Sequence, residues 1–130
     1  MTTKQLIIAT LASGFVMWAL AGIWHKVVAV AFYTQETHAS HQGVGIILGA
    51  YLILGLLMAY LFPVSKLGTQ PIITGLIFGA VIGLLWVFPH ELAMAGAHGK
   101  PLGYVFKNAA WHIVEQGVGG LAIALVITKT

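Results

Sequence analysis

Four long apolar stretches, separated by short polar segments, make up most of the chain. They cover residues 5–25, 43–62, 71–89 and 105–127. Each is close to the roughly 20 residues that an α-helix needs to cross about 30 Å of hydrocarbon. Strands of a membrane β-barrel would be about 10 residues long and would alternate in polarity, which these stretches do not. The pattern predicts an all-α integral membrane four-helix bundle, made of two helical hairpins with short loops, in a single domain over residues 1–130.

Three polar segments connect the expected helices. They cover residues 33–42, 63–70 and 90–104, and we call them loops one, two and three. All four prolines fall at or beyond a predicted helix end, where proline is tolerated. The end of the first helix is left open, because the residues after Lys26 are apolar as well. An even number of helices places both termini on one side of the membrane.

Composition strengthens the membrane prediction and excludes other classes of protein. Hydrophobic residues make up 59% of the chain and charged residues only 7%, against about 45–50% and about 25% in average soluble domains. A soluble globular enzyme and a disordered chain are therefore excluded. The six basic residues are all lysines and form no basic stripe, so we expect no nucleic-acid partner. The expected partners are the lipid bilayer and either other membrane subunits or further copies of the chain.

Glycines recur at four-residue spacing on two of the expected helices. The spacing joins Gly45 to Gly49, and it joins Gly75, Gly79 and Gly83. Small residues at this spacing let membrane helices approach closely. We favour tight packing inside the bundle as the explanation, with homo-oligomerisation through the third helix as the alternative.

Histidine and glutamate gather toward one side of the membrane. All six histidines and all three glutamates fall toward the side of loops one and three, which we call the histidine-rich end. The lysines tie, with three on each side, so their number does not orient the chain. Every lysine of the histidine-rich end has acidic or histidine neighbours that could pair with it, so the opposite side has the clearer positive charge. Because positive residues favour the cytoplasmic side, we expect that opposite side, which carries both termini, to be cytoplasmic in a bacterial inner membrane.

The fourth helix carries the strongest local signal. At about 100° per residue, four positions fall within about 60° of one another: Asn108, His112, Glu115 and Gly119, with Gln116 beside them. An ionisable group inside a membrane is costly and usually faces the bundle interior with a partner. We expect this polar stripe to point inward, with Glu115 pairing with a cation, binding a proton or ligating a metal.

Two histidines at matched depth are candidate cofactor-binding residues. The pair Trp24-His25 on the first helix is repeated as Trp111-His112 on the fourth, and both pairs lie toward the histidine-rich end. His25 and His112 could together supply the axial ligands of a haem between two helices. The alternative is that both histidines form ordinary hydrogen bonds inside the bundle.

Imidazole and carboxylate groups also offer ligands to iron, zinc or copper. His38 and His41 are three residues apart, so they share one face if their segment is helical. A carboxylate-bridged di-iron site is disfavoured, because it needs about four carboxylates and the chain has three. Plain interfacial residues are the alternative to a metal site. The candidate metal ligands are Glu36, His38, His41, His90, Glu91, His98, His112 and Glu115.

The layout resembles uncharacterised families of small bacterial four-helix integral membrane proteins of unknown function. The matching features are Trp24-His25, the glycine-rich segment 75–86, the step 100–102 and the opening of the last helix at 108–112. The resemblance implies the fold and the membrane location, and it implies no function or site.

The short loops and glycine ridges favour an accessory subunit of a larger membrane complex over an enzyme. The histidine- and glutamate-rich cluster would be its binding site for a metal, haem or pigment. The alternatives are a stand-alone metal- or haem-binding redox protein and a proton-coupled carrier, in which His112 and Glu115 relay protons.

Overall fold

The computed structural model describes residues 1–28, 41–65 and 69–130, and these are almost entirely helical. The helices are α1 (Thr3–Ile23), a π-helical turn η1 (Trp24–Val28), α2 (His41–Ser65), α3 (Pro71–His98) and α4 (Leu102–Lys129). Four of them are long and apolar enough to cross a membrane. The predictions of an all-α chain and of four such helices are confirmed.

Local sequence signals explain where the helices begin and end. The α1 helix opens with a capping box, in which the Thr2 side chain accepts from the Gln5 amide and the Gln5 side chain accepts from the Thr2 amide. Pro71 occupies the first turn of α3, where its missing N–H is not needed. Gly99 ends α3 in the left-handed conformation, with φ of 69°, which glycine adopts without strain.

The third helix differs from the prediction at its carboxyl end. The predicted end at residue 89 is wrong, because α3 continues through Pro89 to His98, and α4 begins at Leu102. Most of loop three is therefore helix. Residues 91–97 are mainly Glu, Leu, Ala and Met, whose helix propensity outweighs the local cost of one proline. Pro63 likewise lies inside α2, which ends at Ser65 rather than before the proline.

Glycines set how closely α3 and α4 pack. A Cβ atom added at Gly79 or Gly83 would meet the backbone carbonyl oxygen of Gln116 or His112, and one added at Gly75 would lie 2.5 Å from the Gly120 oxygen. The glycine ridge of α3 is thus filled by α4 of the same chain, so tight packing inside the bundle is confirmed as its explanation. On α2, a Cβ at Gly45 or Gly49 would meet nothing within 4 Å.

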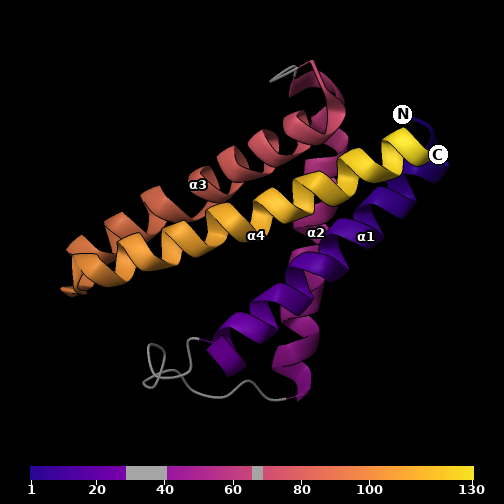
Figure 1. The fold of residues 1–130 in the computed structure, drawn as a ribbon. Helices are drawn as coiled ribbons and strands as arrows, with labels where there is room; N and C mark the ends of the chain where they lie inside the picture. Colours follow the sequence, from indigo (N-terminus) through magenta and orange to yellow (C-terminus); the bar gives the residue numbers. More distant parts are fainter. Residues whose placement is uncertain (29–40, 66–68) are drawn as a thin grey trace.

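The α1 helix links the other helices. It packs closely on α2, where a Cβ at Gly55 would lie 2.9 Å from the Thr10 oxygen. It also packs on α4 near the chain ends, which lie together (Figure 1), and the Gln5 side chain donates to the Ile127 oxygen at 3.5 Å. Away from the termini the α3–α4 pair diverges from the α1–α2 pair (Figure 1).

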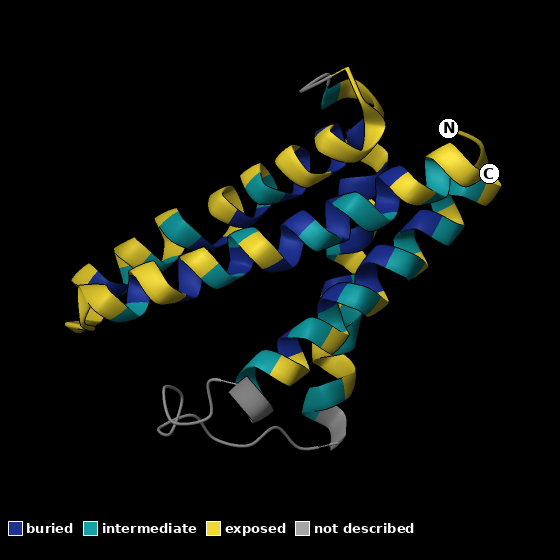
Figure 2. Cartoon of the chain, viewed as in Figure 1, coloured by how far each residue is buried: buried dark blue, intermediate teal, exposed yellow. Residues whose placement is uncertain are grey.

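Buried residues concentrate where α1, α2 and α4 cross, and exposed residues dominate the outer faces of all helices (Figure 2). The core includes Ala9, Met17, Met58 and Ile123, each at most 1% exposed. Large apolar side chains are exposed on every long helix, for example Ile53 and Leu85 at 62% and 64%. A surface with many large apolar side chains is typical of a chain surrounded by lipid or by other membrane subunits.

Candidate polar site on the fourth helix

The predicted polar stripe of α4 lies inside the bundle. Glu115 and Gln116 are completely buried, and Asn108 and His112 are 7% and 8% exposed. This burial confirms the expectation that the stripe points inward. We refer to Trp111, His112, Glu115 and Gln116 as the α4 polar cluster.

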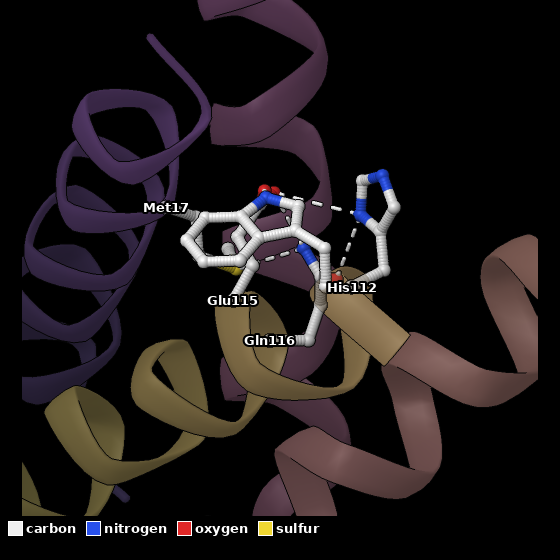
Figure 3. Close-up of polar contacts among 5 residues, drawn as sticks. Met17, His112, Glu115 and Gln116 are labelled. Atoms are coloured by element: carbon white, nitrogen blue, oxygen red, sulfur yellow. Dashed lines mark hydrogen bonds and ion pairs between the residues drawn. The ribbon is translucent and has the colours of Figure 1, made fainter. Parts of the chain in front are cut away.

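Glu115 is the acceptor at the centre of this cluster (Figure 3). Its Oε2 accepts a 2.7 Å hydrogen bond from the indole nitrogen of Trp111, and its Oε1 accepts a 3.0 Å hydrogen bond from Nε2 of Gln116. The Gln116 nitrogen also contacts the sulfur of Met17 on α1 at 3.6 Å. Both carboxylate oxygens therefore have partners, so Glu115 is held in one position.

The contacts of His112 define its neutral tautomer. Its Nδ1 lies 3.2 Å from Oε1 of Gln116 and 3.7 Å from Oε1 of Glu115. Both neighbours are acceptors, because the Gln116 amide nitrogen already faces Glu115 and Met17. In the neutral ring the proton therefore sits on Nδ1, and Nε2 keeps a free lone pair.

The second ring nitrogen of His112 is directed away from Glu115 and Gln116 (Figure 3). Nε2 has no hydrogen-bond partner within the described ranges. Among the described residues, the one fully buried side-chain nitrogen or oxygen that lacks a partner is Oε2 of Glu91, so Nε2 of His112 is not fully buried. Nε2 therefore reaches the surface of the bundle. The His112 side chain is 10% exposed, which suits a nitrogen at the edge of an enclosed site.

Aromatic rings of η1 and α3 contact the cluster on two sides. The rings of Trp24 and Trp111 stack with centroids 4.4 Å apart, which joins η1, the continuation of α1, to α4 and confirms the matched depth of the two tryptophans. On the other side, Trp86 of α3 meets the His112 ring edge-on at 5.5 Å, and Tyr51 of α2 meets Trp86 at 6.0 Å. His112 thus packs toward α3, whereas Trp111 packs toward α1.

Sequence reasoning singled out the α4 residues but missed Met17 and Tyr51. Met17 belongs to a face of α1 with four-residue spacing, Ala9, Ser13, Met17 and Ala21, all of which are buried. Mostly small residues at this spacing could have indicated which side of α1 packs against α2 and α4. Tyr51 carries no comparable pattern, because its contact with Trp86 depends on how α2 meets α3.

The predicted ligands on α3 lie outside the α4 polar cluster. His90 and His98 are exposed on α3, and Glu91 is half-buried. His25 lies in η1 on the α1 side, and its shared cofactor with His112 stays a prediction. Glu36 and His38 lie outside the described residues, as does the side chain of His41.

The histidine-rich end is divided by the divergence of the two helix pairs. The α3 residues lie toward the tip of the α3–α4 pair, apart from the ends of α1 and α2 (Figure 1). Among the described side chains, those of residues 1–26, 43–65 and 69–130, no three His, Asp or Glu groups come close enough to share a metal ion. The imidazole of His112 and the carboxylate of Glu115 lie 3.7 Å apart because the two residues are three positions apart on α4.

No protein-family profile, curated protein or solved structure matches the chain. The resemblance to small bacterial four-helix membrane proteins therefore stays a prediction.

Proposed function

We propose that the chain is an integral membrane protein that acts as a small accessory subunit of a larger membrane complex. In this proposal, its two helical pairs span a bacterial inner membrane as hairpins, with both termini cytoplasmic. Four helices with the length and hydropathy of membrane spans support insertion. Exposed apolar side chains on all of them support contacts with lipid and with other subunits.

The observation that carries a binding role is the support given to His112. Metal-ligating histidines almost always donate their second ring N–H to a carboxylate, carbonyl or water, which orients the ring and raises its basicity. In this chain, Nδ1 of His112 faces Gln116 and Glu115 in that manner, while Nε2 is left for a ligand. We therefore propose that the subunit holds a haem, pigment or metal group at His112.

The residues of the α4 polar cluster have distinct roles in this proposal. His112 would hold the group through Nε2, and Gln116 and Glu115 would orient its ring. Trp111 would keep Glu115 in place through its 2.7 Å hydrogen bond. A bound group would supply electron transfer or light absorption, and the protein would supply position and exclusion of water.

The proposal is tested on protein purified from membranes in a mild detergent, with an affinity tag that contains no histidine. We expect a chromophore or stoichiometric iron, zinc or copper, together with co-purifying membrane subunits. The signal should be lost in His112→Ala and kept in His98→Ala, a matched control because His98 is exposed on α3. A colourless, metal-free protein that is stable and monodisperse by itself would refute both parts.

A proton-coupled carrier is the second candidate, favoured by the 3.7 Å approach of His112 to Glu115. Neighbouring imidazole and carboxylate groups inside membrane proteins form proton relays. Liposomes containing the purified protein and a pH-sensitive dye would report proton flux. Flux that disappears in Glu115→Gln would favour the carrier, and equal leakage in empty and loaded liposomes would remove it.

A further inference from the structure

We propose that Nε2 of His112 is the single protein ligand of a metal tetrapyrrole, the class of cofactor that includes haem and chlorophyll. This inference rests on the proposed function, which leaves metal, haem and pigment open, and it selects among them. Three features of the site carry it: the number of ligating atoms, their direction, and the surroundings of the ring.

One ligating nitrogen faces outward at this site. Glu115 lies on the Nδ1 side of the His112 ring, and both of its oxygens accept hydrogen bonds, from Trp111 and Gln116. The carboxylate therefore cannot bind the same metal ion as Nε2. Protein sites for a bare zinc ion use three or four side chains. A tetrapyrrole supplies four nitrogens of its own, so one axial histidine is sufficient to hold its metal.

The direction and depth of Nε2 support the same class of ligand. His112 lies ten residues into α4, or about 15 Å along the helix. Nε2 has no hydrogen-bond partner among the described residues, and such a nitrogen is costly in lipid. A metal in a hydrophobic macrocycle would use that lone pair without bringing a charged, hydrated ion into the apolar region.

The neighbours of the ring are those a flat apolar macrocycle would contact. Trp86 is edge-on to His112 and is itself 42% exposed, and the adjacent Leu85 is 64% exposed. Tyr51 closes the α2 side through its contact with Trp86. Aromatic and aliphatic surfaces with one fixed polar atom are typical of cofactor sites.

The test is a titration of the full chain, in a mild detergent and with a tag that lacks histidine, with iron protoporphyrin. We expect a shifted Soret band that saturates at one equivalent. His112→Ala should lose this band, and His90→Ala should keep it because His90 is exposed. In His112→Gly, added free imidazole should restore the band, which a merely structural role for His112 would not produce. Circular dichroism and gel filtration confirm that each variant is folded.

Glu115→Gln tests the positioning role of the carboxylate. The variant keeps Nε2 and the contact of Nδ1 with Gln116, but it removes the carboxylate charge 3.7 Å from Nδ1. The iron midpoint potential should therefore rise, and haem affinity should fall roughly tenfold or more. A potential unchanged from wild type would show that Glu115 does not act through His112.

The outcomes separate the two proposals. Haem binding that is equal in wild type and His112→Ala, as expected for haem dissolved in the micelle, would overturn the tetrapyrrole site. So would His112-dependent binding of zinc, iron or copper ions without a porphyrin, although that result would keep the proposed function. An isolated chain that binds haem through His112 but has no membrane partner would support the site and refute the subunit role.

Discussion

The replacement Gly79→Ala tests whether the glycine ridge holds α3 against α4. A Cβ at this position would meet the carbonyl oxygen of Gln116, and it would lie 2.6 Å from the carbonyl carbon and 2.8 Å from the Cα of Gly117. All three atoms belong to backbone, so no flexible side chain can move aside. The helices must separate by about 1.5 Å to bring the shortest of these contacts into the ordinary range.

The expected loss of stability follows from two opposing effects. Overpacking a close interface costs about 1–3 kcal/mol, and the rigid backbone contacts place Gly79→Ala at the upper part of that range. The better helix propensity of alanine offsets about 1 kcal/mol. We therefore expect a net decrease of about 2 kcal/mol in the free energy of unfolding.

Gly96→Ala is the matched control, because it makes the same chemical change in the same helix. A Cβ at Gly96 would meet nothing within 4 Å, so only the propensity effect applies and stability should stay equal or rise by up to about 1 kcal/mol. Both variants are unfolded by adding dodecyl sulfate to mixed micelles, with circular dichroism and tryptophan fluorescence as readouts. Equal stability of the two variants would refute the close α3–α4 packing.

Three further changes test individual side chains in the same unfolding assay. Glu91→Leu should stabilise the protein by about 1–3 kcal/mol, because it removes a carboxylate whose Oε2 is buried with no hydrogen-bond partner among the described residues. A loss of stability would contradict that prediction. Glu115→Leu should destabilise it by about 1–2 kcal/mol, since Trp111 and Gln116 lose their acceptor, and an unchanged midpoint would show that the cluster adds nothing. Trp24→Ala should lower the free energy of unfolding by about 0.5–1.5 kcal/mol for the lost ring stack, in addition to the loss from the buried area. It should also alter the fluorescence of Trp111. A spectrum equal to that of the wild type after subtraction of one tryptophan would refute the stacking.

Apolar length and polar periodicity were sufficient to predict the main elements. Helix-length apolar stretches with few charges leave little choice but four long helices, because the backbone must satisfy its own hydrogen bonds in an apolar surrounding. The inward direction of His112 and Glu115 was predictable as well, since the few polar groups of a long apolar helix are expected to face the bundle interior, where they can find partners. These inferences depend on residues close together in the chain.

Tertiary structure decided which distant residues meet. The helix continues through Pro89 because its neighbours and the long α3–α4 contact outweigh one missing hydrogen bond. Trp86 reaches His112 because the glycine ridge sets the separation of the two helices. The same close pairing lets α3 and α4 diverge from α1 and α2, which separates histidines that the sequence places on one side. Helix separation and crossing depend on packing over the whole interface, and no local pattern of apolar residues specifies them.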